Sequence, residues 1–180
     1  VVGMAGILDT SRFKYFLSQE LKVPVKKINS LVLGGHGDTM VSMLNHTTIE
    51  GKPILDLVKE GKLKKNSLEA IVKRTKSGGA EIVKLLEKGS AFYAPAASGV
   101  EMAESYLKDL KKQLPCAAYL DGDYDVKDLY AGVPVIIGKQ GIEKVIKINL
   151  NAQEKKDFDH SIEAVKELFS AAKKIDINLK

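Results

Sequence analysis

Hydrophobic residues recur every three or four positions over several long stretches of this chain, which is the period of a helix with one apolar face. In DTSRFKYFLSQELK, the apolar side of such a helix would consist of Phe13, Phe16, Leu17 and Leu21. The same spacing elsewhere favours further helices, bounded by residues that typically cap helix ends. The predicted helices span residues 9–22, 66–88 and 95–113, and a final helix follows Asn151.

Two of these helices carry a more specific signal. Asn151 is followed three residues later by Glu154, the pairing of a capping box, in which each side chain bonds the backbone N–H of the other. The helix over 66–88 contains two consecutive glycines, Gly78 and Gly79. Because glycine is tolerated in a helix interior chiefly where the helix bends or another group packs closely, we expect a kink or a close backbone approach there.

Shorter apolar runs, bounded by Gly, Pro, Asn and Asp, read as strands. They cover residues 1–6, 28–34, 39–49, 115–122, 132–138 and 141–150. Strands and helices follow one another in clusters and do not alternate as they would in a doubly wound parallel sheet. The chain is therefore predicted to be α+β, with a twisted, mainly antiparallel sheet packed with long helices.

Composition sets the outer limits of the prediction. The 180 residues are enough for one domain with a substantial core, so we expect a single domain over residues 1–180. No apolar run approaches the roughly 18–20 residues needed to span a bilayer, so no membrane partner is expected. A single cysteine, Cys116, excludes an intrachain disulfide and fits a reducing compartment.

The net charge of +5 raises the alternative of a basic module that binds nucleic acid. The lysines, however, are dispersed singly or in pairs among acidic residues, and no aromatic side chains alternate with them to stack on bases. Solvated helix faces explain this charge more simply, so we expect no nucleic-acid partner. Only two of the 28 cationic residues are arginines, Arg12 and Arg74, and each deserves separate consideration because a guanidinium can grip a carboxylate with two hydrogen bonds.

One of the chain's three histidines, His36, lies in the glycine-rich stretch LGGHGDT. Histidine can give and take a proton near neutral pH, and its glycine neighbours leave room for a ligand. The stretch therefore favours an acid/base residue, while a loop histidine that caps a strand remains open. A metal site is less favoured, because no second His or Cys lies at ligand spacing.

Asp9 and Arg12 are three residues apart, so on a helix they share one face. They are either an intrahelical ion pair or two functional groups. In the second case Asp9 would hold a histidine in one tautomer and stabilise its imidazolium form, and Arg12 would bind a substrate carboxylate.

Together, VVGMAGILDTSRF, LGGHGDTMV and GSAFYAPAAS resemble the C-terminal half of the lactate/malate dehydrogenase family, in particular its lactate-dehydrogenase-like malate branch. The resemblance extends over essentially all 180 residues, and its strongest part is the pair L-D-[ST]-x-R-F and G-G-H-G-D. It implies the fold of that family's C-terminal domain and NAD-dependent oxidation of (S)-malate to oxaloacetate, a reaction of the tricarboxylic acid cycle.

The resemblance also implies roles for individual residues. His36 is the proton acceptor in oxidation and the donor in reduction, and Asp9 is its carboxylate partner. Arg12 binds the substrate carboxylate, and Asp38 supports the histidine from the same loop. Ser90 and Ala91 line the pocket near the substrate. SAFY at 90–93, where the lactate branch usually has a bulkier YTSW, favours malate over lactate.

The sequence contains no G-x-G-x-x-G turn between a strand and a helix. By family resemblance, NAD is bound mainly by an N-terminal Rossmann domain that is absent from these residues, so we expect the 180 residues alone to be inactive. The resemblance further implies a cytoplasmic homo-oligomer, a dimer or a tetramer. Open alternatives are an L-lactate dehydrogenase domain and, from another class, a nucleic-acid-binding or oligomerisation module.

Overall fold

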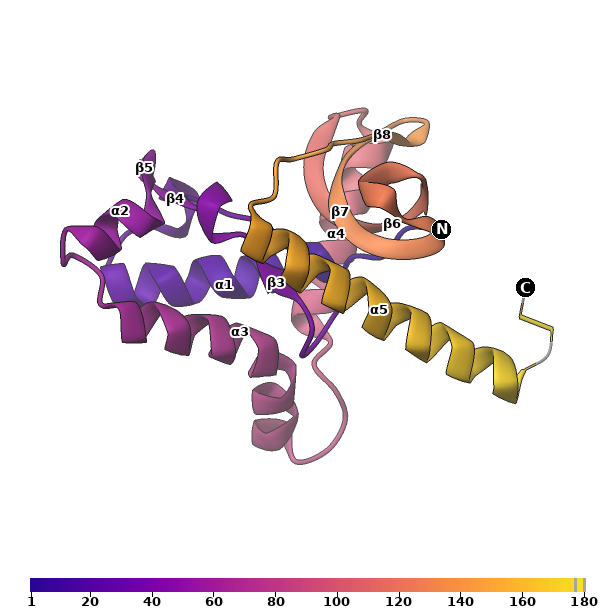
Figure 1. Ribbon diagram of the computed structural model, residues 1–180, viewed down its shortest axis with the longest axis horizontal. Helices are drawn as coiled ribbons and strands as arrows, with labels where there is room; N and C mark the ends of the chain where they lie inside the picture. The colour runs from indigo at the N-terminus through magenta and orange to yellow at the C-terminus, as the bar shows by residue number, and fades with distance from the viewer. Residues whose placement is uncertain (177, 180) are drawn as a thin grey trace.

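The computed structural model describes residues 1–176, 178 and 179, and places helices around small antiparallel sheets (Figure 1). The helices are α1 (Ala5–Leu21), α2 (Ile54–Lys59), α3 (Lys65–Leu86), α4 (Tyr93–Leu107) and α5 (Ala152–Ile175). The strands are β1 (Ile28–Asn29), β2 (Val32–Leu33), β3 (Val41–Ser42), β4 (Thr48–Ile49), β5 (Lys52–Pro53), β6 (Lys112–Asp121), β7 (Lys127–Gly138) and β8 (Gly141–Val145). Short 3-10 helices are η1 (Val25–Lys27), η2 (Leu44–His46) and η3 (Asp123–Asp125).

The strands form separate antiparallel sheets with the orders β1-β4-β5, β2-β3 and β6-β7-β8. The predicted α+β class and antiparallel pairing are confirmed, but the expected single sheet is divided into small ones. An isolated bridge between Gly34, directly after β2, and Gly132 on β7 joins two of them. This bridge brings the glycine-rich turn against the largest sheet.

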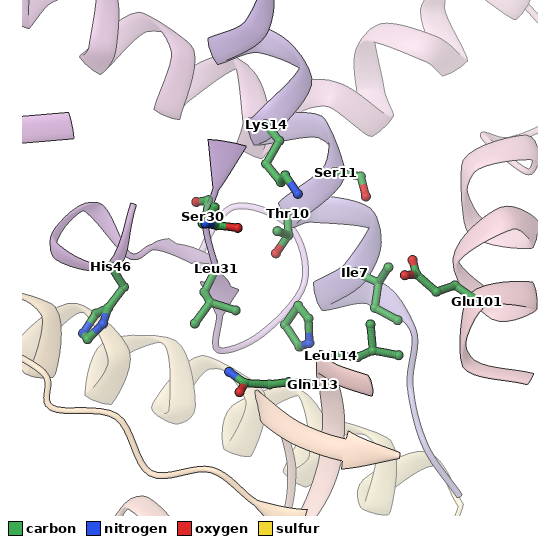
Figure 2. A pocket seen from close by; sticks show the side chains of 12 residues that line it. Ile7, Thr10, Ser11, Lys14, Ser30, Leu31, His46, Glu101, Gln113 and Leu114 are labelled. Atoms are coloured by element: carbon green, nitrogen blue, oxygen red, sulfur yellow. The ribbon is translucent and has the colours of Figure 1, made fainter. Parts of the chain in front are cut away.

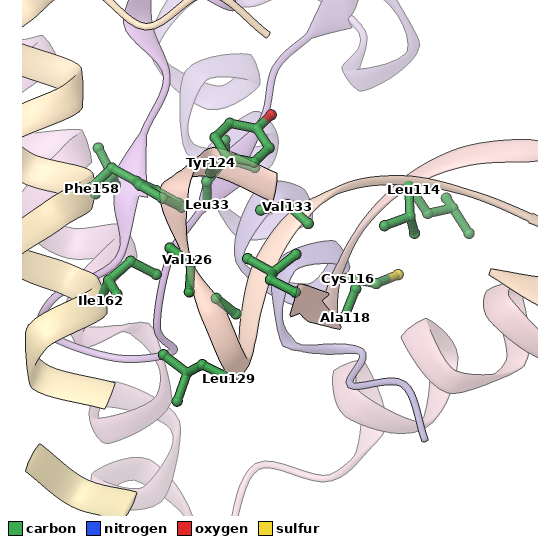
Figure 3. Packing of buried hydrophobic residues seen from close by; sticks show 14 of the residues in the cluster. Leu33, Leu114, Cys116, Ala118, Tyr124, Val126, Leu129, Val133, Phe158 and Ile162 are labelled. Carbon is green, nitrogen blue, oxygen red and sulfur yellow. The ribbon is translucent and has the colours of Figure 1, made fainter. Parts of the chain in front are cut away.

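Helix α1 lies between two hydrophobic clusters. One is built on β6 and β7 and includes Ile7 of α1 together with Phe158 and Ile162 at the start of α5 (Figure 3). The other contains Phe13 and Leu17 of α1 and apolar side chains of α2 and α3. Because both clusters pack against α1, this helix is a rigid support for any side chain that it carries.

The start of α1 differs from the prediction. The helix begins at Ala5 rather than Asp9, and only Gly3 of the expected strand over 1–6 pairs, with Ala117. The residues expected to cap the helix make tertiary contacts from its interior: Asp9 bonds His36, and the Thr10 hydroxyl accepts a hydrogen bond from Val32 N–H at 3.0 Å. Both residues are of types that commonly cap helix starts, but here their side chains bond other parts of the chain and do not cap α1.

The predicted strand over 39–49 is broken into β3, η2 and β4, and the short helix α2 was not predicted. The Thr47 hydroxyl donates a hydrogen bond to the Met43 carbonyl at 2.7 Å, which closes a local turn in place of a strand ladder. The predicted helix over 95–113 begins at Tyr93 and ends at Leu107. There the buried Ser105 hydroxyl bonds Ile137 O and Lys112 N, which ties the chain reversal to β7.

The long helices follow their patterns more closely. The capping box of Asn151 and Glu154 at the start of α5 is confirmed, with both reciprocal hydrogen bonds formed. Helix α3 is continuous through Gly78 and Gly79 but changes direction along its length (Figure 1). The C-terminal part of α5 projects away from the body (Figure 1), and Leu168 on this part is 73% exposed. Among the described residues, no helix is long and apolar enough to cross a membrane.

Candidate functional site

The site is built around the carboxylate of Asp9, which α1 carries into the protein interior. Asp9 is only 2% exposed, and its Oδ2 lies 2.8 Å from Nδ1 of His36. A carboxylate accepts hydrogen bonds only, so Nδ1 of His36 is the donor in this contact. The structure therefore brings Asp9 and His36 into contact across 27 positions of sequence, while their catalytic roles stay predictions.

The turn that carries His36 depends on glycine. Gly34 and Gly37 adopt φ angles of +86° and +94°, in the region that residues with a Cβ rarely occupy. Gly34 and Gly132 exchange backbone hydrogen bonds of 2.8 and 3.0 Å, and a Cβ on Gly132 would press against the Gly34 backbone. The glycines therefore allow the turn to pack closely on β7, while His36 itself stays 51% exposed.

The environment of His36 raises the pKa of its imidazole above the ordinary 6.5. The main cause is the hydrogen bond with Asp9, to which the charge of Asp9 adds; partial burial and the charge of Arg12 act in the opposite direction. The protonated form of His36 is thus retained at higher pH than in a free histidine. The site holds a group that is able to give a proton near neutral pH and to take it back.

Arg12 lies one turn after Asp9 and is 11% exposed. Its Nη1 is 3.7 Å from Asp9 Oδ1, an ion pair too long for a good hydrogen bond. Within the described part of the chain, Arg12 Nε and Asp9 Oδ1 have no hydrogen-bond partner. Across from Arg12, the expected close approach at the glycine pair of α3 is confirmed, because Gly78 packs directly on the Arg12 side chain.

His36 and Arg12 line different cavities, and Asp9 lines only that of His36. Asp9 and His36 line one of about 170 Å³ beside Gly34, Gly35 and Gly132. Arg12 lines another of about 290 Å³ between α1 and α4, with Ser98 and Glu101 on its far side. The structure thus joins both predicted groups to one carboxylate without placing them in one cavity.

The remaining predicted residues are not brought to this pair. Asp38 is exposed and lines a separate cavity of about 300 Å³ with Asp157 and His160. Ser90 and Ala91 lie in the segment between α3 and α4, and neither lines the cavities of His36 and Arg12. The functional assignments of Asp38, Ser90 and Ala91 stay predictions.

A larger cavity of about 420 Å³ lies on another face of α1 (Figure 2). Its α1 residues are Ile7, Thr10, Ser11 and Lys14, spaced so that they share one side of the helix. Asp9 and Arg12 fall outside this set, as does His36. A cavity of about 520 Å³ between α2 and α3 is larger still and is lined by none of these three residues, so cavity size does not locate them.

Supporting residues that the sequence reasoning missed come from distant elements. Ser161 of α5 is fully buried, and its hydroxyl accepts a hydrogen bond from Gly35 N–H at 2.8 Å, next to His36. Thr10 fixes β2 from α1 through Val32 N–H. Nothing local marks Ser161, since it is 126 positions from its partner. Thr10 could have been identified as a supporting residue only from its position next to Asp9 in the sequence.

No group of three or more His, Cys, Asp or Glu side chains that could hold a metal ion occurs within residues 1–176, 178 and 179. Cys116 is buried on β6, and burial raises the pKa of its thiol to about 12. At neutral pH the thiol stays protonated and packs as a small apolar group.

The chain is similar to a known protein family, both in its sequence and in its fold. The model of the lactate/malate dehydrogenase alpha/beta C-terminal domain matches residues 7–175. Malate dehydrogenase from Pelagibacter ubique is 67% identical over 179 residues, which cover 99% of this chain and 56% of that protein. The crystal structure of Cryptosporidium parvum malate dehydrogenase has a TM-score of 0.94 and 47% identity, covering 97% of this chain and 55% of that one.

A further solved structure is lactate dehydrogenase from Eimeria maxima with NADH and oxamate. It has a TM-score of 0.93 and 42% identity, and the match covers 98% of this chain and 55% of that one. The chain thus spans a little over half the length of the relatives that it matches. By the family model and by 67% identity to a curated relative, this chain belongs to the lactate/malate dehydrogenase family, whose α/β C-terminal domain it represents.

Proposed function

We propose that this chain is the substrate-binding and proton-transferring domain of an NAD-dependent malate dehydrogenase, which interconverts (S)-malate and oxaloacetate. The observation that carries the proposal is the 2.8 Å contact of Asp9 with His36, with Arg12 one helical turn away. Oxidation of a 2-hydroxy acid requires one group that exchanges the hydroxyl proton and another that binds the carboxylate, and His36 and Arg12 are groups of these two kinds. The relative named malate dehydrogenase, at 67% identity, supports malate as the substrate.

His36 would move the proton at Nε2. Because Nδ1–H is directed at the Asp9 carboxylate, the neutral ring has its lone pair on Nε2, and the side chain as a whole is about half exposed. In malate oxidation this nitrogen takes the hydroxyl proton, and in oxaloacetate reduction the imidazolium returns it. Asp9 fixes the tautomer and stabilises the charged ring, which agrees with the raised pKa of His36.

Arg12 would hold the carboxylate next to the reacting carbon. Its guanidinium offers a planar fork that matches a carboxylate, and burial keeps competing water low. Asp9 partly balances its charge from 3.7 Å, a distance that leaves N–H donors available for a second anion. Arg12 thereby orients the substrate relative to His36.

NAD fits this chain only in part. The cavity of about 170 Å³ at His36 is smaller than pockets that enclose drug-sized ligands, so it could accept one end of a dinucleotide and not the whole. Glycines 34, 35 and 132 would line that end without side chains. When bound, NAD supplies the acceptor for the hydride of the alcohol carbon. We propose that the rest of NAD is held by a nucleotide-binding domain of the complete enzyme, since the matched relatives are nearly twice as long as this chain.

We further propose the finer properties that the resemblance implies: Ser90 and Ala91 near the substrate, Asp38 as a supporting residue, and a homo-oligomer, dimer or tetramer, in the cytoplasm. Exposed apolar side chains such as Leu168 support burial against another domain or subunit. The reaction would belong to the tricarboxylic acid cycle, with no nucleic-acid or membrane partner. L-lactate dehydrogenase is the second candidate, supported by the Eimeria maxima structure.

The test is NADH oxidation by the complete enzyme, with oxaloacetate and pyruvate assayed in parallel. We expect oxaloacetate to be strongly preferred and the activity to fall about 10²–10⁴-fold in His36→Asn, because acid/base catalysis is lost. His46→Asn is the matched control, since His46 bonds Asn149 O away from the site. Preference for pyruvate would replace malate by lactate, and a His36→Asn enzyme of normal activity would refute the role of His36.

A further inference from the structure

Helix α3 carries two consecutive residues without side chains in its interior. Gly78 and Gly79 lie well inside Lys65–Leu86, and glycine is the least favourable helix residue after proline. Gly78 is also buried, so it does not form a hinge in solvent. Helices α1 and α3 run side by side (Figure 1), and the glycine pair faces Arg12 of α1.

The two glycines differ in how closely they approach Arg12. A Cβ on Gly78 would lie 3.1 Å from Arg12 Cδ and 3.5 Å from Nε. A Cβ on Gly79 would lie 3.7 Å from Nη1 and 3.9 Å from Nη2. Carbon atoms in contact prefer about 3.5–4.0 Å, so a methyl group fits at position 79 and crowds Arg12 at position 78.

Few polar contacts fix the Arg12 side chain. Its ion pair with Asp9 spans 3.7 Å, and Nε is buried with no hydrogen-bond partner among the residues described. Packing must therefore set how deep the guanidinium lies, and the bare backbone at Gly78 lies directly beside the Cδ–Nε segment of Arg12. If Arg12 Cδ moves by a few tenths of an ångström, the guanidinium at the end of the same side chain moves with it.

We propose that Gly78 is a positioning residue for Arg12: its missing side chain lets α3 hold the guanidinium at the depth at which it binds the substrate carboxylate. The proposal rests on the function proposed above. Gly78 touches no substrate in this proposal and acts only through Arg12, whereas Gly79 leaves enough room for a methyl group.

The experiment compares Gly78→Ala with Gly79→Ala in the complete enzyme. Both changes add one methyl group to the same helix and raise its helix propensity alike, so they differ mainly in the distance to Arg12. We expect Gly78→Ala to raise KM for oxaloacetate about fivefold or more, and Gly79→Ala to raise it less than about twofold. KM for NADH should stay unchanged in both.

Equal effects of the two substitutions on KM, or no effect of Gly78→Ala, would overturn the proposal. A crystal structure of the Gly78→Ala enzyme separates this outcome from failure of the proposed function. Displacement of Arg12 Cδ supports positioning whatever the enzyme turns over, and an unmoved Arg12 refutes it. Poor activity of the unmodified enzyme on oxaloacetate would instead count against the function alone.

Gly78→Ala could also prevent folding, and a double variant covers that case. If the crowding is with Arg12, Arg12→Ala should restore the melting temperature of the Gly78→Ala enzyme to that of Arg12→Ala alone. If the double variant stays as unstable as Gly78→Ala, the methyl group clashes elsewhere, and the proposal is wrong.

Discussion

The glycine-rich turn of His36 and the helix that carries Arg12 hold their functional side chains in opposite ways. His36 is half exposed, on a turn whose shape depends on contacts from β7 and α5. Arg12 is nearly buried on α1, between two hydrophobic clusters and against the backbone of α3. Asp9 contacts both side chains and so links the two regions.

The difference follows from what each group is proposed to do. A residue that exchanges protons must reach the substrate and titrate near neutral pH, so partial exposure with one strong carboxylate partner suits it. A residue that binds an anion gains from burial, because electrostatic attraction is stronger away from water. His36 therefore depends on contacts that distant elements make with its turn, whereas Arg12 depends on close packing against the backbone of α3.

Asp9→Asn should have the largest effect, because it damages both regions. We expect kcat for oxaloacetate reduction to fall about 100-fold or more. The substitution removes the charge of Asp9 and replaces its carboxylate by a weaker, neutral hydrogen-bond acceptor, so both influences that raise the pKa of His36 are reduced, while burial and Arg12, which lower it, remain. The pH above which reduction declines should therefore shift downward, as should the pH above which malate oxidation becomes active.

Rate–pH profiles in both directions measure this shift, with Asp56→Asn on the exposed surface of α2 as control. An unshifted profile would mean that Asp9 does not set the protonation of His36.

Arg12→Lys tests the buried side alone. A lysine keeps the charge but loses the fork and the Nε–H, so kcat/KM for oxaloacetate should fall about 10–100-fold, chiefly through KM. The pH profile set by His36 should keep its shape, apart from a small upward shift if the charge moves away.

Arg74→Lys is the matched control, because Arg74 is the other arginine and its contacts with Glu81 and Phe16 lie at the surface. A similar loss of kcat/KM in the two variants would indicate a general effect of arginine on stability. Arg12 would then have no specific role in binding the substrate.

Ser161→Ala tests the support of the exposed side and should have the smallest effect. Loss of the hydroxyl leaves Gly35 N–H without its partner, at a cost of about 1–3 kcal/mol in stability. The loosened turn should lower kcat about fivefold, with KM for oxaloacetate little changed.

Ser170→Ala, on the exposed part of the same helix, should change neither quantity. Thermal unfolding and initial rates measure both effects. If Ser161→Ala altered KM more than kcat, the turn and the Arg12 region would not be separate.

The sequence was sufficient to predict the long helices and the antiparallel strands, and it pointed to the three residues that the structure brings together at Asp9. Helix boundaries were less predictable, because Asp9 and Thr10 have the side chains of caps and use them on His36 and Val32. The strand predicted over 39–49 failed because Thr47 closes a local turn that an apolar pattern does not reveal. The glycine pair of α3 predicts a kink or a close backbone approach, but the sequence does not indicate that Arg12 is the group that approaches it.

By itself, the sequence determined what is periodic or local: the apolar faces of the helices, the capping box of α5, and the one-turn spacing of Asp9 and Arg12. The tertiary structure alone decided which distant groups meet. It set Ser161 against Gly35 across 126 positions and Gly78 against Arg12, whereas the contact of Asp9 with His36 across 27 positions was implied by the family resemblance and by no local pattern. The physical reason is that spacing along a helix follows from backbone geometry, whereas contacts between elements depend on how the whole core packs.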